Sequence, residues 1–327
     1  MKCKIYLRIL VIMVLALLDN CLNTESRFHQ NITIATLRGP SAISMINMID
    51  NTDSSLHYNF IIKDEPNQVK SMMLNGEADF AILPSTMAAI LYNKGLQYKL
   101  AAIPVWGTLY LLGNENIRKW QDLTNKRVYM MEKGATPDIV FKLLLLKNGL
   151  DPDKDVILDY SFPTHIELAK AVISGRANLA VISEPMVSLV IPQNTKIKPI
   201  FDFNKEWKRV MTDSIPFAQT ALLVKNSLAD KHPEQLERFL KLYKACIYWI
   251  FAKPDSAAAL IVKHKILPDS SVARSCIPRC NIKLVLTDSI KTGIIRYFKV
   301  FYDINHDIIG GKLPDENFFY KSQNHHN

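Results

Sequence analysis

Four short segments carry the residues best suited to bind a small molecule. Each joins an apolar run typical of a strand to a segment typical of a helix. Each also holds a proline within two residues of a glycine, serine or threonine. The segments are Arg38, Gly39, Pro40 and Ser41; Pro84, Ser85 and Thr86; Gly134, Ala135, Thr136 and Pro137; and Glu184 and Pro185. A helix that begins in this way presents backbone N–H groups at the positive end of its dipole, where an anion or a polar ligand atom can bind. Any single junction could simply cap its helix, but two in each half of the chain favour a ligand cleft between two lobes.

Three side chains near these junctions could add specificity. Arg38 could hold a carboxylate, sulfonate or phosphate through two hydrogen bonds. Glu184 could hold an amine or an aminopyrimidine, and Trp106 could stack on a flat or cationic ligand. The alternatives are a surface ion pair for the two charged residues and core packing for Trp106. Arg38 and Glu184 together predict a zwitterionic or cationic heteroaromatic ligand.

The elements that must position these residues alternate between strand and helix. Apolar runs at residues 32–37, 58–63, 79–83 and 99–105 predict strands, and residues 40–50, 66–75 and 85–93 predict the helices between them. This alternation predicts an α/β fold with parallel sheets covered on both faces. Ligands of such sheets bind beyond the carboxyl ends of the strands, where the four junctions lie.

Two short sequence motifs recur along the chain. Residues 76–82 (GEADFAI) recur 99 positions later as GRANLAV, and residues 32–39 are echoed 95 positions later by residues 127–134. Two matches at nearly the same offset predict a duplicated α/β build. From about Thr220 onward the pattern becomes mostly helical.

The first residues have the composition of an export signal. Lys2, Lys4 and Arg8 precede an apolar run from residue 9 to residue 18, which predicts a signal peptide over residues 1–20 and a linker over residues 21–30. Leu18 stands three positions before Cys21, as in a relaxed bacterial lipobox, so Cys21 is expected to carry a lipid. Ordinary cleavage nearby is the alternative.

The remaining chemistry excludes several classes of function. Cys276 and Cys280 could form a disulfide in an oxidising compartment, but a lone C-x3-C pair is weak as a metal site, so no metal and no cofactor are expected. The net charge of +9 is dispersed and no nucleic-acid-binding motif is present. No apolar run is long enough to span a bilayer, so membrane contact is expected only through the lipid. Phosphate-binding glycine loops, G-x-S-x-G elbows and H-E-x-x-H motifs are absent.

The order and spacing of the motifs resemble those of the periplasmic substrate-binding proteins of ABC importers. The similar branch is the one that includes nitrate, sulfonate, taurine and thiamine-precursor binders. The segments that carry the resemblance are residues 38–41, 75–81, 122–128 (DLTNKRV), 134–137, 174–177, 184–185, 277–282 (IPRCNI) and 310–314 (GGKLP).

The resemblance implies a type II periplasmic-binding-protein fold, with two lobes that each hold a mostly parallel sheet flanked by helices. Two crossover strands, near residues 105–113 and 216–224, would join lobe 1 (residues 31–113 plus 216–320) to lobe 2 (residues 114–215). The expected protein is an exported monomer, in the periplasm or on the outer face of the cytoplasmic membrane. It would be no enzyme, and would deliver a sulfonate, an amino-acid-like solute or a pyrimidine of the thiamine-precursor type to a permease and its ATPase. The alternatives are an enzyme of the same fold, similar to a pyrimidine synthase whose cysteine-rich iron-binding stretch is missing here, and a structural or adhesive surface lipoprotein.

Overall fold

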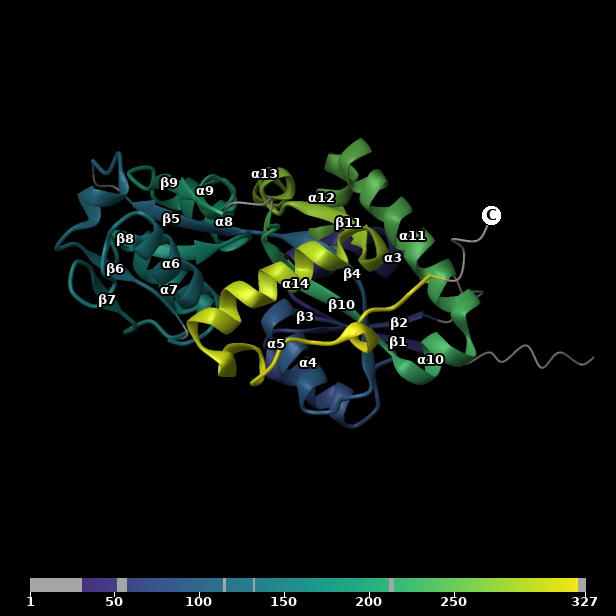
Figure 1. Ribbon diagram of the computed structural model, residues 1–327. Helices are drawn as coiled ribbons and strands as arrows, with labels where there is room; N and C mark the ends of the chain where they lie inside the picture. Colours follow the sequence, from purple (N-terminus) through teal and green to yellow (C-terminus); the bar gives the residue numbers. More distant parts are fainter. Residues whose placement is uncertain (1–30, 52–57, 114–115, 132, 212–214, 323–327) are drawn as a thin grey trace, which may run out of the picture.

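The chain forms two lobes, each built on its own β-sheet (Figure 1). The computed structural model describes residues 31–51, 58–113, 116–131, 133–211 and 215–322. The predicted signal peptide (1–20), the linker (21–30) and Cys21 lie outside these residues. Within the described ranges, no single helix has the length and apolar character needed to cross a membrane. One pair of helices, Pro233–Ala252 and Pro254–Lys263, meets these criteria together, but it is bent by 110°.

Lobe 1 contains a six-stranded sheet with the strand order β11-β4-β10-β3-β1-β2. Its strands are β1 (Ile32–Leu37), β2 (Tyr58–Lys63), β3 (Phe80–Pro84), β4 (Tyr98–Trp106), β10 (Ala218–Lys225) and β11 (Ile282–Leu286). Its helices are α2 (Pro40–Ser44), α3 (Ile46–Asp50), α4 (Pro66–Leu74), α5 (Ser85–Asn93), α10 (Asn226–Lys231), α11 (Pro233–Ala252), α12 (Pro254–Lys263), α13 (Ser270–Cys276) and α14 (Thr287–Ile304). Short 3-10 helices lie at η2 (Ile277–Arg279), η3 (His306–Ile309) and η4 (Glu316–Phe318).

Lobe 2 contains a five-stranded sheet with the order β7-β6-β8-β5-β9. Its strands are β5 (Leu109–Gly113), β6 (Arg127–Tyr129), β7 (Ile157–Asp159), β8 (Leu179–Ser183) and β9 (Lys198–Asp202). Its helices are η1 (Trp120–Leu123), α6 (Thr136–Lys147), α7 (His165–Ile173), α8 (Met186–Gln193) and α9 (Phe203–Val210).

Both sheets are mixed, which corrects the expectation of mostly parallel sheets. Strand β1 is parallel to β2 and β3, and β6 is parallel to β7 and β8. In contrast, β10 is antiparallel to β3 and β4, β11 is antiparallel to β4, and β5 is antiparallel to β8 and β9. The chain leaves lobe 1 at the end of β4 and returns at the start of β10, so these neighbours must run in opposite directions. The alternation of strands and helices in the sequence does not indicate that β10 runs antiparallel to its neighbours.

The two lobes are joined close to Gly107 and Thr108, which lie between β4 and β5. Strand β5 falls within the crossover predicted at residues 105–113, and it pairs with lobe 2 strands. We therefore propose that the lobes divide at Gly107 and just before Ala218. A Cβ atom at residue 107 would lie 2.3 Å from Cδ1 of Phe217, so the two crossover segments can approach this closely only because residue 107 is glycine.

An aromatic cluster links the lobes beside these crossovers. Trp207 of α9, in lobe 2, stacks on Phe217 with their ring centroids 5.1 Å apart. It also contacts Tyr297 and Phe301 of α14 in lobe 1, with centroid separations of 5.7 and 6.3 Å. All four rings are fully buried. Figure 1 shows α14 crossing the middle of the molecule toward lobe 2.

The repeated motif, at residues 76–82 and 175–181, follows a helix in each lobe and ends that helix in the same way. Gly76 follows α4 and Gly175 follows α7, with φ angles of +72° and +74°. In each lobe the next residue, Glu77 or Arg176, donates its backbone N–H to a carbonyl five positions earlier. Glycine reaches this left-handed conformation at little cost and so stops the helix before the following strand.

Candidate functional site

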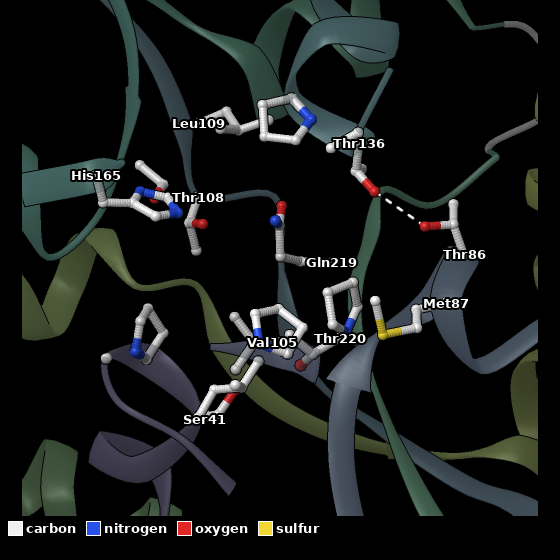
Figure 2. Close-up of a pocket in the computed structure, with 18 of the residues that line it drawn as sticks. Ser41, Thr86, Met87, Val105, Thr108, Leu109, Thr136, His165, Gln219 and Thr220 are labelled. Carbon is white, nitrogen blue, oxygen red and sulfur yellow. Dashed lines mark hydrogen bonds between the residues drawn. The ribbon is translucent and has the colours of Figure 1, made fainter. Parts of the chain in front are cut away.

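A cavity of about 680 Å³ lies between the two lobes, at the ends of β1, β3 and β8 where helices begin. Figure 2 shows residues of both lobes converging on it, with Thr136 and His165 from lobe 2 and Ser41, Thr86 and Gln219 from lobe 1. The volume is in the range of pockets that enclose small molecules.

Twelve of the fourteen residues named from the sequence as candidate ligand contacts line this cavity. They are Arg38, Gly39, Pro40, Ser41, Pro84, Thr86, Gly134, Ala135, Thr136, Pro137, Glu184 and Pro185. Ser85 and Trp106 do not. The Ser85 hydroxyl is buried and donates to the carbonyl of Ala218 at 2.5 Å, and Trp106 Nε1 donates to the carbonyl of Lys283 at 2.8 Å. Both side chains are therefore held by lobe 1.

The junctions of the two lobes touch each other. Thr86 Oγ1 of α5 and Thr136 Oγ1 of α6 share a hydrogen bond of 2.9 Å across the cleft (Figure 2). Gly39 has a φ of +112°, and a Cβ atom there would lie 3.3 Å from Cδ of Pro185 in lobe 2. The segments predicted to begin helices therefore also form contacts between the two lobes.

Glu184 is the centre of a second contact between the lobes. Its side chain is fully buried. Oε1 accepts a hydrogen bond from Nε of Arg279, in lobe 1, at 2.6 Å, and another from the Ser188 hydroxyl at 3.0 Å. Oε2 accepts from the backbone N–H of Ser188 at 3.1 Å. Burial raises the pKa of Glu184, and the Arg279 guanidinium opposes this shift. A carboxylate held in this way already has a cationic partner, so a ligand amine is not required to balance its charge.

The two cysteines that could form a disulfide lie on either side of Arg279. Cys276 and Cys280 are free, fully buried thiols whose sulfur atoms are 3.1 Å apart. Burial, together with the neighbouring Cys276, raises the pKa of the Cys280 thiol. The expected bond is therefore not formed in this structure.

Arg38 stands at the rim of the cavity and is also engaged. Its Nε donates to Oδ1 of Asp64 at 2.5 Å, and its Nη1 donates to the carbonyl of Lys265 at 2.8 Å. Its side chain is 38% exposed. Its charge is therefore largely balanced within the protein.

The charged groups around the cavity are mostly acidic. The described lining contains Asp64, Glu65, Glu184 and Asp307, and Arg38 is its one lysine or arginine. The walls are otherwise apolar or carry neutral hydroxyl and amide groups, among them Met87, Val105, Leu109, Thr108 and Gln219. An anion would meet this surface without a free cation to bind it.

Sequence reasoning missed the polar residues of the cavity floor. Gln219 and Thr220 are the second and third residues of β10, and both line the cavity. Their signal in the sequence is a polar pair at the start of an otherwise apolar strand, AQTALLVK. Because polar pairs are common at strand ends, this pattern does not by itself indicate a binding site.

His165 also faces the cavity, from the start of α7. Burial lowers its pKa to about 4. Its Nδ1 lies 3.4 Å from the hydroxyl of Ser183 at the end of β8. The imidazole is therefore neutral at pH 7 and can both donate and accept a hydrogen bond.

The pKa of His165 can be measured directly. We expect its ring resonances in 13C-edited NMR to titrate near pH 4, because the charged form is poorly solvated in this position, whereas an ordinary histidine titrates near 6.5. Since the folded state disfavours the protonated ring, the contribution of His165 to stability is present above pH 6.5 and is lost as the pH falls toward 4. The spectrum of His165→Gln assigns the signal. A midpoint near 6.5 would contradict the expected burial.

The sequence matches the model of a family described as NMT1/THI5 like over residues 53–257, more than half of the chain. The chain belongs to the NMT1/THI5-like family. No protein of curated function matches this NMT1/THI5-like chain.

Solved structures similar to the NMT1/THI5-like chain include components of ABC transport systems. One is an ABC transporter structure from Parabacteroides distasonis, with a TM-score of 0.76, 26% identity, and coverage of 89% of this chain and 99% of that chain. The periplasmic aliphatic sulphonate binding protein SsuA from Escherichia coli has a TM-score of 0.72 and 14% identity, covering 89% and 92%. The alkanesulfonate-binding protein SsuA from Xanthomonas axonopodis pv. citri, bound to MOPS, has a TM-score of 0.63 and 12% identity, covering 87% and 94%. The resemblance to ABC substrate-binding proteins and the periplasmic-binding-protein fold predicted from the sequence are confirmed.

Proposed function

We propose that this protein is the extracytoplasmic solute-binding component of an ABC importer. It encloses one small solute between its lobes and delivers it to a membrane permease driven by an ATPase. The observation that carries the proposal is the cavity between the lobes, walled by helix starts from both sheets. The similarity to the ABC transporter structure from Parabacteroides distasonis supports it.

The chemistry of the cavity favours an uncharged or weakly basic heteroaromatic solute, such as a pyrimidine. Four carboxylates line it, and the guanidinium of Arg38 is already paired with Asp64. A sulfonate or the carboxylate of an amino acid would have to share the Arg38 guanidinium with the carboxylate of Asp64. A flat neutral ring instead gains apolar contact with side chains such as Met87, Val105 and Leu109, together with hydrogen bonds from hydroxyl and amide groups.

Binding rather than catalysis is supported by the state of His165. With a pKa of about 4 it is a weak base, poorly matched to proton abstraction at neutral pH, although Ser183 lies beside it. The described residues also include no group of three or more His, Cys, Asp or Glu side chains that could hold a metal ion. Export through residues 1–20 and lipid attachment at Cys21 are part of this proposal, because an importer component of this kind acts outside the cytoplasm.

The proposal is tested on protein purified after expression of the full chain. Mass spectrometry of small molecules released by unfolding is expected to identify a bound solute. A thermal-shift panel of pyrimidines, sulfonates and amino acids is expected to show a rise in melting temperature with pyrimidines. X-ray scattering should then show compaction on binding. No bound solute, no response in the panel and an unchanged scattering profile would instead favour a structural surface protein.

A further inference from the structure

Gln219 and Thr220 line the cavity, and each carries a buried polar atom that has no hydrogen-bond partner among the described residues. Oε1 of Gln219 and Oγ1 of Thr220 are buried, and neither makes a hydrogen bond with any described residue. Both side chains line the cavity. A buried polar atom without a partner is costly to a folded protein and is rare in native structures. Two such atoms on consecutive residues of one cavity indicate that a bound ligand supplies their hydrogen-bond partners.

A β-bulge at Gln219 changes the direction of its side chain. Opposite β4, Ala218 faces Trp106 and Thr220 faces Val105, so Gln219 is an extra residue in a β-bulge. A bulge redirects the side chain of the inserted residue and often lies beside a functional site. In Figure 2 the amide of Gln219 points away from Thr220 and toward Leu109 and Thr136 of lobe 2.

We propose that Gln219 and Thr220 are specificity-determining residues that bind a hydrogen-bond donor on an uncharged solute. Oε1 of Gln219 can only accept a hydrogen bond, so it selects an N–H or O–H group. The hydroxyl of Thr220 can accept a hydrogen bond from the solute or donate one to it. The assignment rests on the proposed solute-binding function and names the feature that this site recognises.

The first test needs no ligand. Thr220→Val removes the unpaired hydroxyl at nearly constant volume, so the melting temperature of the solute-free protein is expected to stay the same or rise. The matched control is Thr287→Val. Thr287 is also buried, but its hydroxyl donates to the carbonyls of Ala101 and Tyr320, at 3.1 and 3.0 Å. That change should lower the melting temperature by several degrees. A comparable loss in Thr220→Val would assign its hydroxyl a structural role and overturn the proposal.

The second test uses two probes of similar shape, 4-aminopyrimidine and 4-methylpyrimidine, of which only the first carries an N–H donor. Calorimetry at a pH where both rings are uncharged should show that Gln219→Leu weakens binding of the amino compound about 3- to 10-fold. The affinity for the methyl compound should change less than 2-fold. Gln193→Leu, on the exposed end of α8, should leave both affinities unchanged.

The results separate this inference from the proposed function. Equal weakening for both probes would mean that Gln219 acts through shape alone and would overturn the inference. A wild-type protein that binds a sulfonate but not 4-aminopyrimidine would also overturn it, while leaving the solute-binding function intact. A wild-type protein that releases no solute and responds to no compound in the panel would instead contradict the function itself.

Discussion

Replacing Arg279 with alanine is expected to lower the free energy of unfolding by about 2–3 kcal/mol at pH 7, because it leaves the carboxylate of Glu184 buried without its cation. The loss has a ceiling. Glu184 can lose its unpaired charge by binding a proton. From its ordinary pKa of 4.5, protonation at pH 7 costs about 3.4 kcal/mol, and this cost is the upper limit of the loss. Urea unfolding at pH 7 measures the effect.

The pH dependence separates this effect from a simple loss of packing. Without Arg279 the pKa of Glu184 in the folded state rises further, since the cation that opposes its burial is gone. A carboxyl group with a raised folded-state pKa stabilises the fold only when protonated. The deficit of Arg279→Ala is therefore expected at neutral pH and should shrink steadily as the pH falls toward 4.5.

Two variants control for this interpretation. Arg274→Ala removes another arginine of the same region, on α13, whose ion pair with Asp255 is exposed, so it should cost less than about 1 kcal/mol. The double variant Arg279→Ala with Glu184→Gln has no buried charge and should regain much of the lost stability. A deficit of the same size at every pH, or no recovery in the double variant, would contradict the expected role of the pair.

Trp207→Ala should have the largest effect on stability, about 3–5 kcal/mol. The side chain is fully buried and contacts Phe217, Tyr297 and Phe301, so alanine leaves a large cavity between the lobes. Its Nε1 also donates to the carbonyl of Ile215 at 3.0 Å, a bond that the variant loses.

Denaturant unfolding followed by circular dichroism measures this loss. The matched control is Tyr248→Ala on α11, which removes an aromatic side chain that is 68% exposed and should cost less than about 0.5 kcal/mol. A loss below about 1 kcal/mol for Trp207→Ala would show that the aromatic cluster contributes little to the junction of the lobes.

The helix starts of the site could be predicted from the sequence because their signals are local. Proline within two residues of a glycine, serine or threonine after an apolar run indicates where a helix begins, and Pro40, Pro84 and Pro185 all line the cavity. The two-lobed α/β build could be predicted for a related reason, since the repeated phrase at residues 76–82 and 175–181 ends a helix and starts a strand within a few positions.

The partners of the charged side chains could not be predicted in the same way. Glu184 pairs with Arg279, 95 positions away, and Arg38 pairs with Asp64, 26 positions away. Such contacts depend on how the lobes pack, which no local pattern records. An ion pair was an alternative for Glu184 from the sequence, but its partner Arg279 could not be identified for this reason. The bulge at Gln219 is likewise a matter of strand register, which the sequence of β10 alone does not specify.

The position of lobe 2 within the chain has a consequence for how the protein folds. The segments entering and leaving this lobe belong to β4 and β10, which are hydrogen-bonded neighbours in the lobe 1 sheet. Pairing these strands from an unfolded chain requires closing a loop of over a hundred residues, at a considerable entropic cost. A lobe 2 that is already folded holds its two ends together and removes most of that cost. We therefore expect lobe 2 to fold before strands β4 and β10 pair in the lobe 1 sheet.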